Sequence, residues 1–227
     1  MNKIFTFALA ILASVSCEFI SFSGESSKNQ RLFLDGPVQV DTLDLRDFDA
    51  ITVNGTADVS FIQANEFLVE LKANEGLLEQ LNCRVEDGML ILAFKENVKI
   101  RPNDFDFVIK APFIKSFTVN GAADLDIDNY LSDSELLLEV NGAGDLDINN
   151  VLVPSLSIEL RGAGDIKARD IETDSLSVSV KGAGDAKLSG HAGKARFLIS
   201  GAGDIDVRGL KTDQIEQEKH GVGRIRL

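Results

Sequence analysis

A four-residue phrase recurs about every twenty residues through the second half of this chain, with its leading glycines spaced by 21, 20, 20 and 19 residues. A repeat of this length corresponds to one supersecondary unit, and its regular return is typical of a solenoid. The copies are Gly121-Ala122-Ala123-Asp124, Gly142-Ala143-Gly144-Asp145, Gly162-Ala163-Gly164-Asp165, Gly182-Ala183-Gly184-Asp185 and Gly201-Ala202-Gly203-Asp204. An early copy begins at Gly55, and a degraded one begins at Gly221.

Apolar and polar residues alternate on both sides of each phrase. Leu138 and Val140 precede the second phrase with Glu139 between them, and Leu146 and Ile148 follow it. Alternation with a period of two indicates strands with one buried face. Equivalent strands of successive repeats are expected to pair in parallel, so the sequence predicts an all-β parallel β-helix (a solenoid) with coils of about 20 residues.

The leading glycine of each phrase is predicted to be a structural turn residue, because glycine adopts backbone angles that a Cβ forbids and lets coils approach closely. These glycines are Gly121, Gly142, Gly162, Gly182 and Gly201. The alanine after each glycine is expected at a tight inner corner with room for one methyl group. The column comprises Ala122, Ala143, Ala163, Ala183 and Ala202.

The two ends of the repeat region are less regular. Strand-like segments in the first third, such as 49–55, 67–72 and 88–94, are interpreted as wider coils of the same body with an N-terminal cap. The stretch 73–81 is compatible with one or two helical turns. At the other end, 224–227 is still strand-like and little cap is evident. An uncovered coil exposes unpaired backbone groups, so this end either uses its arginines to discourage stacking or associates with another copy.

The first residues are typical of an export signal. Lys3 precedes an apolar run from 4 to 15 that is too short to span a bilayer as a helix, and small residues then precede Cys17. We expect a signal peptide over 1–16, with lipidation of Cys17 or simple secretion as the alternatives. Residues 17–31 are polar and rich in Gly and Ser over much of their length, as in a flexible tether.

Composition excludes some partners. The formal net charge is −13, which argues against nucleic acid and against docking on anionic lipid. A membrane is therefore expected to be contacted only through the lipid anchor.

Apart from Cys17 the chain has one cysteine, Cys83, which cannot form an intrachain disulfide and is expected to be a buried, inert thiol.

One aspartate closes each phrase, and this column allows two interpretations. As a carboxylate ladder it could bind Ca²⁺, a cation that takes several oxygen ligands. As a structural column it would accept hydrogen bonds from turn N–H groups, which is the interpretation we favour, so no metal is predicted. The column comprises Asp58, Asp124, Asp145, Asp165, Asp185 and Asp204.

Other polar residues do not assemble into recognisable chemistry. The outward column Asp126, Asp147, Lys167, Lys187 and Asp206 is expected to be a solvated sheet face. His191 is expected to pack at a coil corner, and His220 to face outward. No catalytic residues and no cofactor are predicted, because nucleophile arrangements and phosphate-binding loops are absent from the sequence. Sugar-processing β-helices use aromatic platforms, whereas this chain has no Trp and one Tyr.

Two further motifs resemble a known family. Phe48-Asp49-Ala50-Ile51 precedes the early Gly55 copy, and Ala111-Pro112-Phe113-Ile114-Lys115-Ser116 leads into the main series. Together they resemble the head GIN domain of auto-transporter adhesins, over about 40–227, and we place the domain at 32–227. The resemblance implies a right-handed parallel β-helix and a cell-envelope location, but no established activity.

The sequence therefore predicts a non-enzymatic, adhesin-like binding module of the bacterial envelope. It would contact a protein, a glycan or another copy of itself, at the outer membrane or cell surface as a lipoprotein, or in the periplasm. A rigid structural spacer is the alternative, and a carbohydrate-active enzyme is a distant third. An exposed apolar patch would favour binding, and uniformly mixed polar faces would favour the spacer.

Overall fold

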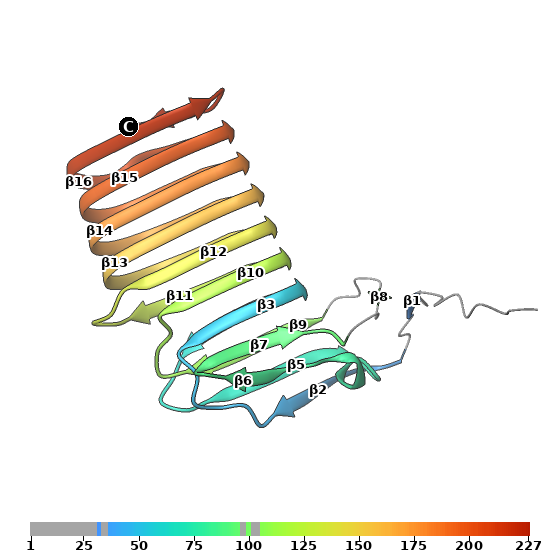
Figure 1. The fold of residues 1–227 in the computed structure, drawn as a ribbon. Coiled ribbons are helices and arrows are strands. Elements are labelled where there is room, and N and C mark those ends of the chain that lie inside the picture. Colours follow the sequence, from blue (N-terminus) through green and yellow to red (C-terminus); the bar gives the residue numbers. More distant parts are fainter. Residues whose placement is uncertain (1–30, 33–35, 96–98, 101–104) are drawn as a thin grey trace, which may run out of the picture.

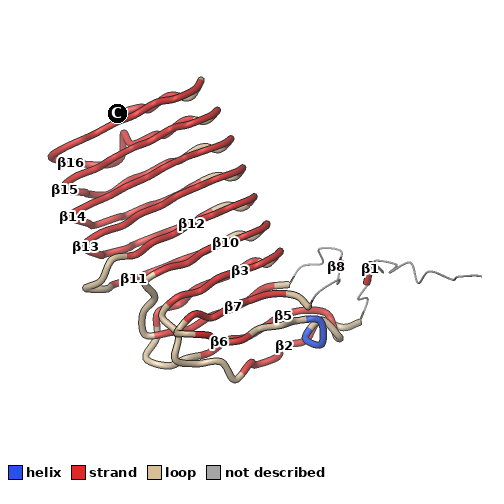
Figure 2. Tube along the Cα trace, in the orientation of Figure 1, coloured by secondary structure: helices blue, strands red, loops and turns tan. Residues whose placement is uncertain are grey.

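The computed structural model describes residues 31–32, 36–95, 99–100 and 105–227. The expected signal peptide and Cys17 lie outside these residues, as does the expected tether apart from Arg31. Within the described part, no helix is both long and apolar enough to cross a membrane. The only helical segment in the described part is one 3₁₀ turn, η1 (Leu78–Gln80), which falls within the stretch 73–81 (Figure 2, blue).

The second half of the chain is a stack of parallel coils (Figure 1). Equivalent strands of successive coils pair in parallel and in register, so that Gly142 lies beside Gly162 and Gly162 beside Gly182. The predicted parallel β-helix is thereby confirmed. The strands are β10 (Ser116–Ala122), β11 (Leu125–Leu131), β12 (Leu136–Ala143), β13 (Leu146–Ala163), β14 (Ile166–Ala183), β15 (Ala186–Ala202), β16 (Asp204–Gly221) and β17 (Arg224–Arg226).

Each full coil has three faces, which the burial pattern of β13 defines. The alternation of buried and exposed side chains skips a residue near Asn150, again at 154–155, and at the Gly-Ala-Gly-Asp corner. Asn150 has a positive φ of 54°, which turns the chain between the first two faces. We call 146–149 of this coil and its equivalents the first face, 151–155 the second face, and 156–161 the third face.

The core is a set of apolar columns along the axis of the stack. On the third face, Val140, Leu160, Val180 and Ile199 occupy one inward column, and each is at most 1% exposed. Full burial of an aliphatic side chain stabilises the fold by about 1.5–3 kcal/mol relative to exposure. Because each side chain packs on its counterparts in the coils above and below, the repeat itself generates the core.

The strands of the first third join the same body, but not in chain order. β3 (Ala50–Thr56) and β4 (Asp58–Gln63) form a regular coil directly under β10 and β11. Beyond that coil lie β7 (Met89–Ala93) and β9 (Asp106–Ala111), which come later in the chain. The interpretation of 67–72 as a wider coil was therefore wrong, because this segment pairs antiparallel with its neighbours, and the chain leaves the stack after β4 and returns beneath it.

An antiparallel layer closes this end of the stack. Its strands are β2 (Val38–Leu43), β5 (Leu68–Asn74) and β6 (Arg84–Glu86), which pair antiparallel with β5, β9 and β7 respectively. The short strands β1 (Arg31–Leu32) and β8 (Lys99–Ile100) pair separately in parallel. Only β6 and β7 are joined directly by a short connection, as antiparallel neighbours allow, whereas β2 with β5 and β5 with β9 pair between segments far apart in sequence. The expected N-terminal cap therefore exists, as an antiparallel layer.

Both outer strands place polar side chains where the core would otherwise continue. On β2, Gln39 and Asp41 pair with buried Ala73 and Leu71, and so face the core side. On β16, Gln217 and Lys219 stand beside the buried Phe197 and Ile199 of β15. Inward polar and charged residues on an edge strand oppose edge-to-edge pairing. The coil that carries β16 thus has a chemical cap that the sequence interpretation overlooked.

Candidate functional site

The Gly-Ala-Gly-Asp corner brings successive coils into their closest contact. Gly162 has a φ of 147°, and a Cβ at this position would lie 1.8 Å from the carbonyl oxygen of Gly142. Only glycine tolerates both the backbone angle and the approach. All five predicted turn glycines have positive φ: Gly121, Gly142, Gly162, Gly182 and Gly201.

The alanines of this corner point outward. Ala143 and its equivalents in the other coils are exposed, so the expected tight inner corner was wrong. Ordinary alternation explains this direction, because Val140 is buried and Asn141 and Ala143 then fall on the outward side of the strand. The result is a column of exposed methyl groups along one edge of the stack.

The aspartate column forms a ladder of hydrogen bonds between coils. Oδ1 of Asp124 accepts the backbone N–H of Asp145 at 2.8 Å, and Oδ1 of Asp145 accepts that of Asp165 at 2.8 Å. The ladder continues to Asp185 and Asp204 at 3.0 and 2.8 Å. The donors belong to the next coil and not to the same turn. Among the described residues, no three Asp, Glu, His or Cys side chains are grouped so that they could hold a metal ion.

The first face carries the expected outward column of charges. Asp126 and Asp147 face each other on β11 and β13, followed by Lys167, Lys187 and Asp206. Partial burial raises the pKa of Asp126, and the neighbouring carboxylates, with Asp147 foremost, raise it further. This end of the first face is therefore a region of negative potential.

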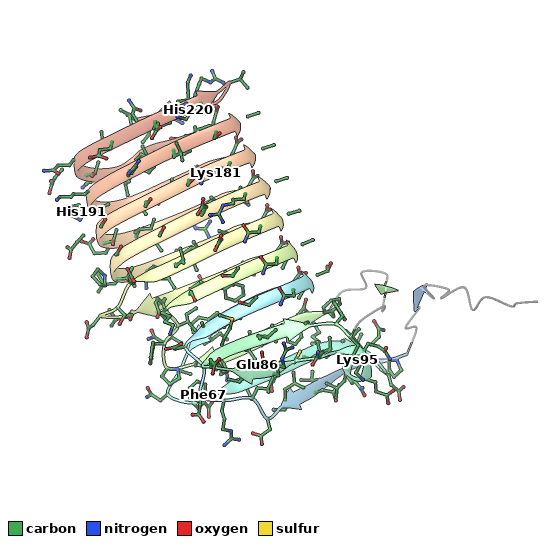
Figure 3. The ribbon with its side chains drawn as sticks, in the orientation of Figure 1. Phe67, Glu86, Lys95, Lys181, His191 and His220 are labelled. Atoms are coloured by element: carbon green, nitrogen blue, oxygen red, sulfur yellow. The ribbon has the colours of Figure 1, made fainter. Side chains whose placement is uncertain are left out.

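The two histidines and Cys83 were also considered in the sequence, and none of them lies in a cluster of candidate metal ligands among the described residues. His191 does not pack at a corner: it stands beside Glu172 in register, and its Nδ1 lies 3.1 Å from Glu172 Oε1. Figure 3 shows His191 at the edge of the stack and His220 on the uppermost coil, where it is exposed as expected. Cys83 is half-buried, and burial raises the pKa of its thiol, which disfavours the reactive thiolate.

The third face is polar and internally paired. Arg161 forms ion pairs with Glu139 and Glu159, and Lys181 pairs with Glu159 at 2.6 Å. Asn120 and Asn141 form part of an asparagine ladder on the same face, with a 3.1 Å hydrogen bond between their side chains. Lys181 marks this face in Figure 3. Its charged groups largely satisfy one another and offer little to a ligand.

The second face differs, because leucine side chains lie exposed on it. Leu131 on β11 and Leu152 on β13 are register partners and are 57% and 46% exposed. They line a groove of about 270 Å³ together with Pro154. The complete lining is Leu131, Ser132, Asp133, Leu152, Val153, Pro154, Glu172, Thr173 and Asp174, and we call it the leucine groove.

The rim of the leucine groove is acidic. Asp133, Glu172 and Asp174 line it, and no Lys or Arg does. Oε1 of Glu172 lies 3.1 Å from Nδ1 of His191. Asp133 and Asp174 form no ion pair within the described part of the chain. An apolar floor with an acidic rim can bind an apolar group that carries positive charge beside it.

The leucine groove was not predicted from the sequence, although a signal was present. Val151, Leu152 and Val153 are three consecutive apolar residues in a strand, and strict alternation leaves one of them outside. Gln63 extends the groove's edge toward the first third of the chain. Its amide nitrogen donates to the carbonyl oxygens of Pro112 and Leu131, both at 2.8 Å, which brings Pro112 next to Leu131.

Solved structures show the same fold. A protein from Bacteroides fragilis named a "putative adhesin" superposes with a TM-score of 0.72 at 18% identity, covering 85% of this chain and 98% of that chain. A "putative lipid binding protein" from Parabacteroides distasonis gives a TM-score of 0.66 at 20% identity, covering 87% and 96%. At these identities the likeness concerns the fold alone.

Sequence comparison identifies the family more directly. No curated protein matches the chain. The family model described as "Putative auto-transporter adhesin, head GIN domain" matches residues 47–227, which contain every coil and the leucine groove. The chain therefore belongs to the head GIN domain family of auto-transporter adhesins.

Proposed function

We propose that this protein is a non-enzymatic binding module of the cell envelope that contacts a partner protein through the leucine groove. Family membership indicates an adhesin-like, exported protein of the surface or envelope. The observation that carries the proposal is the exposure of Leu131 and Leu152, which occupy adjacent outward positions of the sheet. Exposed apolar patches on soluble proteins mark contact sites, and single exposed leucines do not.

The charge of the rim selects the partner's chemistry. The carboxylates of Asp133, Glu172 and Asp174 would repel an acidic surface and anionic lipid. The proposed partner segment therefore presents leucine-like side chains flanked by Lys or Arg. The rigid stack supports this role, because a groove carried by strands keeps its shape between encounters.

The two other candidate functions have weaker support. A spacer needs only a rigid stack, and the paired third face fits that role, but a spacer gives no reason for the exposed leucines. A carbohydrate-active enzyme needs converging acids. The carboxylates that face each other on the stack, Asp126 and Asp147, lie outside the leucine groove.

Peptide binding tests the proposal. Fluorescence anisotropy with a 12-residue Leu/Lys peptide should give saturable binding, and Leu152→Asp should weaken it at least tenfold. Leu137→Asp is the matched control, since Leu137 is an exposed leucine on the third face. A Ser/Lys peptide of the same length is the control for non-specific attraction between a basic peptide and a protein whose net charge is −13. Equal binding of both peptides, or equal loss in both variants, would refute binding through the groove.

Attachment and location are further parts of the proposal. We propose that Cys17 is acylated after removal of residues 1–16, which would tether the domain to a membrane. Cys17→Ser should then move the protein from the membrane fraction to the soluble fraction. Protease treatment of intact cells separates the compartments: loss of the protein places the groove outside the cell, and protection confines its partners to the periplasm.

A further inference from the structure

A pair of lysines on the first face lacks counterions. Lys167 on β14 and Lys187 on β15 are register partners, and both are exposed. Like charges at directly opposite positions of neighbouring strands destabilise a sheet. Neither lysine forms an ion pair with any residue that the structure describes.

The carboxylates that would ordinarily neutralise these lysines are already occupied. In the same column, Asp147 precedes Lys167 and Asp206 follows Lys187. Asp147 is bound by Arg169. Asp206 accepts hydrogen bonds from Nε and Nη2 of Arg208 at 2.9 and 2.6 Å, which holds the pKa of Asp206 far below its usual range. Two ammonium groups are therefore left facing each other between two satisfied acids.

The lysines line a hollow with mixed polar walls. It has a volume of about 470 Å³, and its lining includes Arg169, Ser189, Asp165 and Asp185 besides the two lysines. Small-molecule sites typically measure about 300–1,000 Å³. Arg169 is engaged by Asp147, so the ammonium groups of Lys167 and Lys187, which form no ion pair with a described residue, are the cations that remain to bind a negatively charged group.

The polar groups of the hollow also suit hydroxyl groups. Oδ1 of Asp165 and of Asp185 accepts a backbone N–H within the ladder, which fixes each carboxylate in position. The second oxygen of each remains as an acceptor. Lysine stems are apolar and can lie along a flat ring while their ammonium groups bind an anion. A sugar ring presents this combination of hydroxyl groups and apolar edge.

We propose that this hollow binds a sugar residue that carries one negatively charged group. Lys167 and Lys187 would bind the anionic group, and Asp165, Asp185 and Ser189 would bind ring hydroxyls. The site lies on the first face and is separate from the leucine groove, so it adds a glycan-directed contact to the module and does not depend on the proposed function.

Calorimetric titration of the whole protein at low ionic strength tests the site with D-glucuronate, glucose and inorganic sulfate. Screening by salt weakens exposed charge pairs, so low salt gives the clearest signal. Glucuronate should bind at least tenfold more tightly than glucose or sulfate. The double variant Lys167→Gln/Lys187→Gln should lose at least tenfold in affinity for glucuronate.

The control variant is Lys194→Gln/Lys211→Gln, which makes the same change in net charge at exposed lysines outside the hollow. It should bind glucuronate within twofold of the unmodified protein, and circular dichroism should show that both variants keep the fold. Sulfate binding as tight as glucuronate binding would overturn the sugar assignment. Absence of saturable binding, or an equal loss in the control variant, would overturn the site.

Discussion

Substitution of Gly162 by alanine probes the contact on which the stacking of coils depends. Gly162 has a φ of 147°, and the new Cβ would lie 1.8 Å from the carbonyl oxygen of Gly142 in the preceding coil. Contacts of this kind below 3.0 Å force atoms to move, and here the obstacle is backbone in both coils. The coils must separate at this corner or the turn must change.

The expected cost has two parts. Backbone strain at a φ of 147°, which is adopted essentially by glycine alone, costs about 1–3 kcal/mol for a residue with a Cβ. Separation of the coils weakens the hydrogen bonds that flank the corner, from Gly144 N–H to Ala163 O at 3.1 Å and from Leu146 N–H to Asp165 O at 2.9 Å. Each such bond contributes about 0.5–1.5 kcal/mol, so the total loss should be about 2–6 kcal/mol.

Urea unfolding followed by circular dichroism measures this loss, and Gly88→Ala is the matched control. Gly88 also has a positive φ, 76°, but a Cβ there would meet only Asp49 Oδ1 at an ordinary 3.5 Å. The control therefore reports strain without the clash, and should cost about 1–2 kcal/mol. Equal destabilisation by the two substitutions would refute the idea that close approach of the coils requires glycine.

Three further predictions concern the charges of the first face, the aspartate ladder and the outer strand β16. Asp126→Asn should stabilise the fold at pH 7 by about 0.5 kcal/mol, because it removes repulsion from Asp147. The folded-state pKa of Asp126 is raised, so this gain should shrink as the pH falls toward 3; a pH-independent gain in melting temperature would contradict it. Asp165→Ala should cost about 1 kcal/mol, since the N–H of Asp185 loses its acceptor, whereas Asp165→Asn should cost less; equal unfolding midpoints for the two would argue against the ladder. Gln217→Leu/Lys219→Ile should convert the protein to end-to-end oligomers in light scattering, and a variant that stays monomeric would show that these residues do not block association.

The fold of the repeat region could be predicted because each repeat contains the full pattern of buried and exposed residues of one coil. Each coil repeats the alternation of Leu138, Val140, Leu146 and Ile148, and parallel stacking of identical patterns is the arrangement that buries them all. The order of coils in the first third could not be predicted in this way. The placement of β3 between β7 and β10 depends on pairing between segments far apart in sequence, which periodicity does not report.

The error at His191 has a specific cause. The count from each aspartate assumed coils of equal length, but β15 has one residue between Leu188 and Gly190 where β14 has two between Ala168 and Ile171. The missing residue shifts His191 by one position, so that it lies beside Glu172 and not beside Ile171. The leucine groove and the hollow beside Lys167 and Lys187 could not be predicted from the sequence, because stacking brings together side chains that belong to different repeats.

Hydrogen exchange of the whole protein, with and without the Leu/Lys peptide, shows directly which face of the stack binds the peptide. Binding in the leucine groove should slow exchange in segments that cover 131–135, 151–154 and 172–175, where the lining residues lie. The third face, at 157–161 and 177–181, should show no change. Protection on the third face, or no protection anywhere at saturating peptide, would contradict the account.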